Sequence, residues 1–267
     1  MGVLSLLKKE VILAGLKKGE RTDGRGLLEY RKVEIKTGYI GKAEGSALVR
    51  LGDTKVIAGV KIDIGTPFPD TPDMGVQIVN AELIPVASAV FEPGPPGEED
   101  IELARVIDRG LRSAEAVDMS QLAIIPGSRV WTIFIDIYPL DHDGNLIDAS
   151  GLAAMSALLD TKMPVAEVVD ENITLSENKK PLPIKTRVVY VTLAKIGDYI
   201  IVDPTFEEEL VADARLTFAI NEDRNICGIQ KGGSGSFKVK EILEAKKIAL
   251  EVAEGLFEKL PPKPTSE

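Results

Sequence analysis

The sequence predicts an α+β protein made of two halves with a similar order of elements. In the first half, segments rich in β-branched residues at 46–51, 55–60 and 130–137 precede a helix rich in small residues. In the second half, strand-like segments between residues 187 and 229 precede a long helix at about 238–259. Because both halves run strands first and helix after, the order indicates a weak internal duplication and mixed sheets packed with helices.

Length and composition set the broad class of protein. The chain has 267 residues, of which 44% are apolar and 28% charged, as is typical of a soluble globular protein with a sizeable core. One cysteine, Cys227, excludes a disulfide framework and indicates a reducing compartment, so we expect the cytoplasm. A net charge of −10 argues against a general nucleic-acid coat but allows a local basic patch. The sequence shows no apolar window as long as the roughly 20 residues of a membrane span.

The chain opens with an amphipathic pattern that predicts a helix at residues 4–17. Its lysines lie in the middle of the pattern, which is unlike a signal peptide. The polar turn Arg21-Thr22-Asp23-Gly24-Arg25 follows, and we expect residues 1–25 to form a docking helix and turn. Alternating hydrophobic residues and turn residues then predict a strand at 33–40, a hairpin of strands 46–51 and 55–60, a strand at 76–84, and proline-rich loops at 65–75 and 92–100.

Three arginines share one face of the helix predicted at about 99–119. Arg105, Arg109 and Arg112 fall within about 60° of one another by the helical repeat, opposite an apolar face. Such a column could clamp phosphate groups. It could instead be a solvated face paired with acidic residues, and the residues alone favour this second interpretation. The acidic residues at helical spacing are Glu102, Asp108 and Glu115.

The stretch from 129 to 160 predicts a strand that ends at Pro139, a polar turn at 141–145 and a helix rich in Ala, Gly and Ser. A strand, a tight polar loop and a buried helix start often hold an anion. The turn also carries Asp141, His142 and Asp143, which are metal-capable side chains. A structural turn is the favoured interpretation, because adjacent turn residues rarely converge on one ion.

The second half contains further candidate sites. Residues 170–183 predict an inter-lobe linker or an exposed hairpin. Glu207, Glu208 and Glu209 with Asp203 and Asp213 form an acidic group that could hold Mg²⁺ or could be a solvated loop. The glycine-rich loop at 232–236 lacks the continuation of a P-loop, so we expect a turn with Ser236 as helix cap.

Several of these stretches, taken in order, resemble the RNase PH superfamily. They are the turn at 21–25, the hairpin at 45–56, the arginine helix, the strand, loop and helix at 129–160, and the segment 199–236. The N-terminal helix and the proline-rich loops make the chain similar to the non-catalytic RNase PH-type ring subunits of archaeal exosomes. The resemblance implies an RNase PH-like two-lobed fold, with βαβα lobes like domain 2 of ribosomal protein S5. We expect lobes at 26–170 and 187–260, a linker at 171–186 and a flexible tail at 261–267.

The resemblance also implies a function and partners. The chain would alternate with a catalytic paralogue in a hetero-hexameric ring, a trimer of heterodimers that degrades RNA from its 3′ end with phosphate as nucleophile. The implied partners are this catalytic RNase PH-type exosome subunit, the RNA-binding cap proteins and RNA. We expect no cofactor, no metal and no membrane contact.

The same resemblance assigns roles to individual residues. The phosphate-binding loop of active members corresponds to residues 144–149, where Leu146 and Ile147 replace a hydroxyl and an arginine and Asp148 adds a negative charge. We therefore expect a degenerate phosphate loop and no catalytic residue. Asp213 matches an acid of active members, and we interpret it as a relic.

The resemblance changes how we interpret the three arginines of the helix predicted at about 99–119. Arg109 matches a position that holds the RNA backbone in the catalytic paralogue, and Arg105 precedes it by one turn. We therefore expect Arg105, Arg109 and Arg112 to contact RNA at a neighbour's site. Two alternatives remain: an active phosphorolytic 3′-to-5′ exoribonuclease that uses Asn145 and the glycine-rich loop, and an interaction scaffold with no role in RNA binding.

Overall fold

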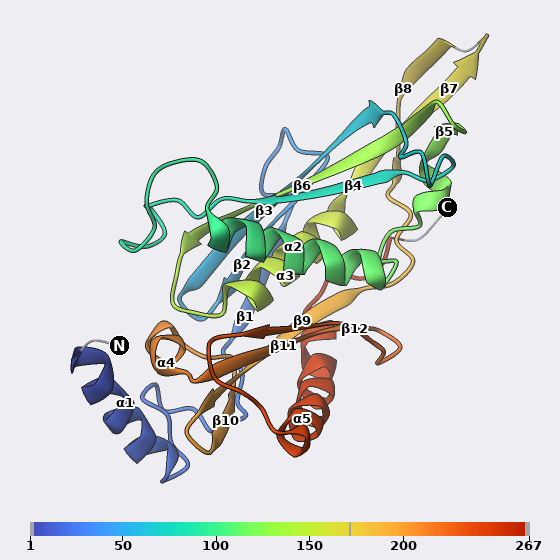
Figure 1. Cartoon of the computed structure of the whole chain (residues 1–267). Coiled ribbons are helices and arrows are strands. Elements are labelled where there is room, and N and C mark those ends of the chain that lie inside the picture. Colours follow the sequence, from blue (N-terminus) through green and yellow to red (C-terminus); the bar gives the residue numbers. More distant parts are fainter. Residues whose placement is uncertain (1–2, 171, 265–267) are drawn as a thin grey trace.

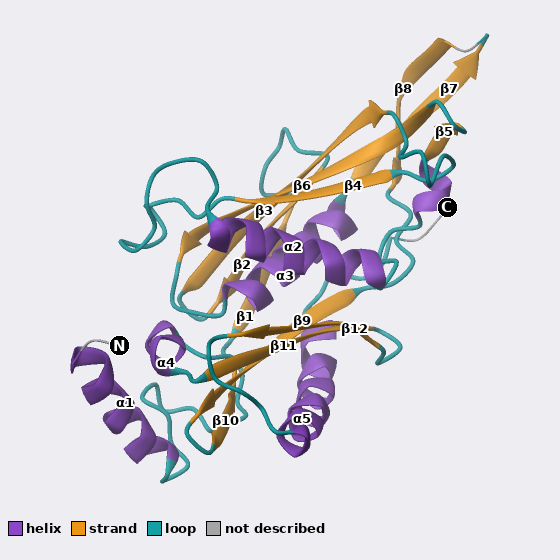
Figure 2. Cartoon of the chain, viewed as in Figure 1, coloured by secondary structure: helices purple, strands orange, loops and turns teal. Residues whose placement is uncertain are grey.

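The computed structural model describes residues 3–170 and 172–264 and arranges them in four layers (Figure 1). A large sheet lies over helices α2 (Glu98–Ser113) and α3 (Leu146–Asp160). A second sheet lies beneath these two helices, and helix α5 (Val239–Phe257) covers its far side (Figure 2). Helix α3 contacts strands of both sheets. This arrangement confirms the α+β plan of mixed sheets packed with helices.

The two sheets differ in their strand directions. The large sheet has the order β1-β2-β3-β6-β4, in which β4 runs parallel to β6 and the other neighbours are antiparallel. The second sheet has the order β10-β9-β11-β12 and is antiparallel throughout. The strands of the large sheet are β1 (Val33–Thr37), β2 (Gly45–Leu51), β3 (Thr54–Gly65), β4 (Val76–Ala81), β5 (Ala123–Ile125), which pairs with β6, and β6 (Arg129–Asp141). Those of the second sheet are β9 (Val188–Ile196), β10 (Tyr199–Val202), β11 (Ala214–Asn221) and β12 (Ile226–Gly232).

Strand β6 continues past the proline that was expected to end it. Pro139 lies inside the strand and is the register partner of Val56. Strand β4 pairs with β6 only as far as Ile137, so no ladder partner on that side requires an N–H from Pro139. The extension carries the strand to Asp141, immediately before the loop of the candidate site.

Helix α3 is buried over most of its length, and its small residues allow close packing. The ring of Tyr190 from β9 lies so close to Gly151 that a Cβ there would be 2.1 Å from the ring. The Tyr190 hydroxyl donates a hydrogen bond to the carbonyl of Ile107 in α2, at 2.6 Å. Tyr190 therefore joins the second sheet to both central helices. The loop before α3 is thus attached to a closely packed helix.

A hairpin projects from one end of the molecule (Figure 1). It consists of β7 (Lys162–Val169) and β8 (Asn172–Pro181), paired antiparallel. Strand β8 takes up most of the segment expected as a linker at 171–186, so the exposed-hairpin alternative describes this segment. The sequence did not distinguish a linker from a strand here, because an exposed two-stranded hairpin carries the same polar and charged residues as a loop.

The N-terminal helix α1 (Val3–Leu16) packs on the second sheet rather than standing free. Ile12 and Leu16 are buried with Ile196, Ile201 and Val211. The sequence did not indicate α4 (Phe206–Val211), which holds the three consecutive glutamates, or the short 3₁₀ turn Met119–Leu122. Residues 265–267 of the expected tail lie outside the described residues, and no helix in the described part is long and apolar enough to cross a membrane.

Candidate functional site

A buried polar network holds the loop between β6 and α3. Arg31 binds Asp203 through two contacts, Nε to Oδ2 at 2.8 Å and an Nη to Oδ1 at 2.7 Å. It also donates to the carbonyl of Asp143 in the loop, at 2.7 Å. Asn145 caps α3 in a left-handed conformation, and its amide donates to Asp203 at 2.7 Å and to Asp148 at 2.8 Å. The loop is therefore fixed from its buried side by paired charges and satisfied donors.

Asp148 belongs to this network and not to the outer surface of the loop. Its side chain is fully buried and accepts hydrogen bonds from the Tyr30 hydroxyl at 2.9 Å and from both the N–H and the hydroxyl of Thr192. Burial raises the pKa of Asp148 from its ordinary value of 3.8 to about 7, although these hydrogen bonds oppose the shift. The expectation that Asp148 repels phosphate does not fit this position, because Asp148 is the third residue of α3 and its carboxylate points into the core.

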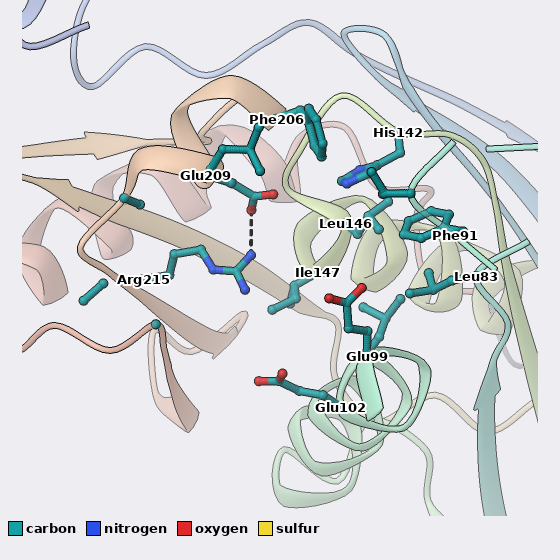
Figure 3. A pocket seen from close by; sticks show the side chains of 16 residues that line it. Leu83, Phe91, Glu99, Glu102, His142, Leu146, Ile147, Phe206, Glu209 and Arg215 are labelled. Carbon is teal, nitrogen blue, oxygen red and sulfur yellow. Dashed lines mark hydrogen bonds and ion pairs between the residues drawn. The ribbon is translucent and has the colours of Figure 1, made fainter. Parts of the chain in front are cut away.

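Leu146 and Ile147 face a cavity of about 430 Å³, which we name the acidic pocket (Figure 3). It lies between the start of α3, the first turns of α2, helix α4 and strand β11. Its apolar lining includes Leu83, Val90, Phe91, Leu103, Phe206 and Leu210. Its charged lining consists of Glu99, Glu102, Glu209 and Arg215. Leu146 and Ile147, where the resemblance led us to expect a lost hydroxyl and a lost arginine, thus form part of an apolar wall.

The charges of the acidic pocket do not favour an anion. Arg215 is the one lysine or arginine among the described lining residues, and its guanidinium pairs with Glu209 at 2.8 Å. Burial raises the pKa of Glu209, although Arg215 opposes the shift. Desolvation works against the charge on Arg215, but Glu209 outweighs it and raises the pKa of the guanidinium. Glu99 and Glu102 are exposed at the rim, so carboxylates outnumber cations around the cavity.

His142 adds no positive charge to the acidic pocket. Burial lowers the pKa of His142 below its ordinary value of 6.5, so the ring is neutral at pH 7. The ring stacks on Phe91 with centroids 5.3 Å apart and meets Phe206 edge-on at 5.0 Å. Its Nδ1 accepts a hydrogen bond from the N–H of Gly144 at 3.2 Å. His142 therefore acts as part of an aromatic wall that shapes the loop.

The acidic residues considered for Mg²⁺ point in different directions. Glu207 pairs with Lys8 at 2.7 Å, Glu208 is buried against Arg21 at 2.8 Å, and Asp203 binds the buried arginines. Asp213 does not line the acidic pocket; its carboxylate binds Lys9 of α1 at 2.5 Å and the N–H of Gly197 at 2.7 Å. Its neighbours Ala212 and Ala214 line the cavity, so the Asp213 carboxylate points away from it, and the relic role of Asp213 stays a prediction.

Asp141, His142 and Asp143 also separate from one another. Asp141 pairs with Lys55 at 3.0 Å, and Asp143 lies 3.3 Å from Arg31, while His142 joins the aromatic wall. Within residues 3–170 and 172–264, no three His, Cys, Asp or Glu side chains gather in a way that could hold a metal ion. The glycine-rich loop does not supply the N-terminal cap of α5. The cap residue is Lys238 and not Ser236, and the N–H of Lys238 donates to the carboxylate of Glu241 at 2.7 Å.

The three arginines of α2 lie together on the surface, and we name Arg105, Arg109 and Arg112 the arginine face. They line a hollow of about 480 Å³ with Gln77, next to strand β4. Arg112 pairs with Asp108 at 2.7 Å and donates to the carbonyl of Gln77 at 3.0 Å. Each member of the face is exposed.

The other two arginines are less engaged than Arg112. Arg109 donates to the side chain of Gln230 at 2.9 Å. Arg105 makes no side-chain hydrogen bond or ion pair with any residue that the structure describes. The alternative interpretation was a solvated face whose arginines pair with acidic residues of the same helix. Among the three arginines, only Arg112 forms such a pair. Glu102 accepts from Gln230 and Glu115 pairs with Lys185.

Sequence reasoning missed the residues that build the acidic pocket and its frame. Arg31 lies just before β1 and Arg215 lies in β11, and a lone arginine in such segments gives no pattern. The turn at 21–25 was recognised, but its role was not: Arg21 and Arg25 bind Glu208 and Asp203, more than 170 residues away. Such contacts depend on how the two halves meet, which local spacing does not encode.

Comparison with known proteins connects this geometry to a family. Residues 29–164 match domain 1 of the 3′ exoribonuclease family, and residues 186–252 match domain 2. The chain is 53% identical to exosome complex component Rrp42 of Thermococcus gammatolerans, over 95% of this chain and 94% of that protein. It is 49% identical to the protein of the same name from Sulfurisphaera tokodaii, over 97% and 94%.

Solved structures give the same result. A chain of the Archaeoglobus fulgidus exosome with RNA bound to the active site aligns with a TM-score of 0.89 and 49% identity, covering 97% of this chain and 99% of that one. A chain of an archaeal exosome core aligns with a TM-score of 0.85 and 45% identity, covering 96% and 97%. Rice Rrp46 shares the fold at a TM-score of 0.69 and 18% identity, covering 89% and 97%.

Proposed function

This chain belongs to the 3′ exoribonuclease (RNase PH) family, and we propose that it is a non-catalytic ring subunit of an archaeal exosome. In this proposal the catalytic paralogue performs 3′-to-5′ phosphorolysis, and this chain completes the ring and positions RNA. Its relatives named as exosome components span nearly the whole of its length. A structural ring subunit follows from this full-length similarity.

The acidic pocket carries the non-catalytic part of the proposal. Phosphorolysis needs inorganic phosphate held as an attacking anion, and this requires cations or N–H donors aimed at it. The start of α3 offers Leu146 and Ile147, the one guanidinium among the described lining residues is paired with Glu209, and the rim is acidic. An anion entering this cavity would meet an excess of carboxylates, so the cavity is a poor site for the nucleophile.

An independently active enzyme is the less favoured alternative. The residues suggested as substitutes are already engaged: Asn145 is 1% exposed and its amide binds Asp148 and Asp203. In the glycine-rich loop, Gly235 donates its N–H to the carbonyl of Asp213 at 2.7 Å. Neither group is free to bind a phosphate ion.

The arginine face carries the RNA-contacting part of the proposal. Its guanidinium groups are exposed, lie on one face of a well-packed helix and border a hollow, which suits the phosphate backbone of a single strand. We infer that Arg105, Arg109 and Arg112 reach RNA bound at a neighbouring catalytic subunit. The same proposal includes cap proteins as partners, a cytoplasmic location, and a division into lobes at 26–170 and 187–260.

Mass measurement of the chain alone and mixed with its catalytic paralogue tests the ring. We expect a hexamer of three heterodimers from the mixture. RNA crosslinking to the assembled ring then tests the contact, with crosslinks expected on α2. A chain that never associates with the paralogue would refute the ring proposal. A ring that crosslinks RNA only through the paralogue would leave an interaction scaffold with no RNA role.

A further inference from the structure

We propose that the acidic pocket receives an arginine or lysine side chain of the adjoining catalytic subunit, so that a former substrate cavity serves as a docking site within the ring. This inference rests on the proposed ring and assigns a role to a cavity that the ring function leaves unused. The occupant is a basic protein segment, not RNA and not a free ion.

The charge of the pocket selects a cation. Glu209 forms an ion pair with Arg215, whereas Glu99 and Glu102 form no ion pair with any described residue. Glu99 has no lysine or arginine partner among the described residues, and Glu102 accepts a single hydrogen bond from the neutral amide of Gln230 at 2.9 Å. Two rim carboxylates without cationic partners attract a guanidinium or ammonium group and repel a phosphate backbone.

The walls of the pocket suit a side chain with an aliphatic stem. Leu146, Ile147 and Phe91 form an apolar surface, and the carboxylates stand at its edge. Arginine and lysine side chains pack their methylene groups on such a surface while the charged end meets polar groups. The mouth also exposes Val90 and Leu210, whose exposed fractions are 61% and 49%, and an adjoining protein segment would cover them.

The position of the pocket favours a ring neighbour as the source of this side chain. Helix α2 lines the pocket with Glu99 and Glu102 in its first turns and carries the arginine face further along. When two subunits of one fold meet about a pseudo-twofold axis, the contacts are reciprocal: the region that one subunit inserts has its counterpart in the other. A neighbour that receives the arginine face beside its own site would, by the same axis, place its equivalent helix beside this pocket.

Neutralising the rim carboxylates tests the inference. We expect the Glu99→Gln, Glu102→Gln double variant to bind the catalytic paralogue about tenfold more weakly, with a flatter salt dependence, because two partly exposed ion pairs are lost. The matched control is Glu244→Gln with Glu258→Gln, at exposed positions on α5 and directly after its end, which makes the same charge change away from the pocket. The control variant should assemble as the wild type does.

A photocrosslink identifies the occupant. A photoreactive benzophenone amino acid at Val90 should crosslink to a basic segment of the paralogue in the assembled ring, and the same group at Val239, which is 74% exposed on α5, should not. Crosslinks from position 90 to RNA or to a cap protein, or assembly of the double variant with wild-type affinity and salt dependence, would overturn the inference while the ring itself stands. Failure of the wild-type chain to form a ring would instead refute the proposed function.

Discussion

The acidic pocket and the arginine face lie on one helix and have opposite chemistry. Glu99 and Arg112 are about 20 Å apart along α2 by the helical rise. The first turns of α2 present carboxylates to a cavity with apolar walls, whereas its later turns present arginines to an open hollow. The pocket presents an excess of carboxylates, whereas the arginine face presents exposed guanidinium groups.

Under the proposed function, the contrast teaches that binding a reactant and binding a polymer are separable tasks. A phosphate nucleophile needs several donors converging on one point, so two aliphatic side chains are enough to remove the site. A phosphate backbone needs exposed cations spaced along a surface, and each contributes a share. The buried network of Arg31, Asp203 and Asn145 holds the loop through contacts within the protein.

The largest expected effect comes from breaking this shared frame. Asp203 is fully buried and binds Arg25, Arg31 and Asn145. We expect Asp203→Asn to lower the free energy of unfolding by about 3–5 kcal/mol, because buried guanidinium charge loses its counterion. Denaturant unfolding measures the change. Asp141→Asn, which removes a partly exposed pair with Lys55, is the control, and an equal loss in both variants would contradict the frame.

Removing the arginine face tests the other half of the contrast. We expect rings built with the Arg105→Ala, Arg109→Ala variant to bind single-stranded RNA about tenfold more weakly. The slope of log affinity against log salt should become shallower by about 1.4, at about 0.7 for each lost phosphate contact. Binding titrations at several salt concentrations give both quantities. Arg50→Ala with Arg224→Ala, two exposed arginines elsewhere, should leave both unchanged, and an unaltered slope in the α2 variant would break the comparison.

The position of Asp148 predicts a pH effect on stability. The pKa of Asp148 is about 7 in the folded chain, above the ordinary 3.8, so the folded state holds the extra proton between these values. The free energy of unfolding should therefore fall as pH rises through 7, by about 1 kcal/mol between pH 6 and 8 from this residue. Thermal or denaturant unfolding at both pH values measures it. Asp148→Asn should remove this component, and an identical pH profile in the variant would place the carboxylate outside the core.

The smallest effect ranks the arginines within their face. Arg112 must leave Asp108 before it can bind RNA, whereas Arg105 has no competing partner among the residues described here. We expect Arg105→Ala to weaken RNA binding more than Arg112→Ala. Asp108→Asn should strengthen binding about two- to threefold by releasing Arg112. Titrations of the three variants in one buffer decide the order, and weaker binding by Asp108→Asn would show that the ion pair positions Arg112 for RNA.

Local pattern predicted the elements but not the long-range contacts. The strands and the main helices follow from alternation and helical spacing, and the arginine face follows from the 3.6-residue repeat. The sequence singled out Leu146 and Ile147, which the structure places at the start of α3, but it could not show that Asp148 turns into the core to meet Thr192. It also could not place Asp213 against Lys9, since this contact depends on where α1 packs. The spacing of residues along the chain predicts helices and strands. It does not predict where a charged side chain points, because this depends on partners that are distant in the sequence.

Phosphorolysis assays on three preparations test the central claim most directly. With RNA and inorganic phosphate, the isolated chain should release no nucleoside diphosphate, and the ring with the catalytic paralogue should release it. The ring carrying Arg105→Ala and Arg109→Ala should need more RNA to reach the same rate. Turnover by the isolated chain, or full activity of the variant ring at limiting RNA, would contradict the claim that this subunit supplies RNA contacts and no phosphate site.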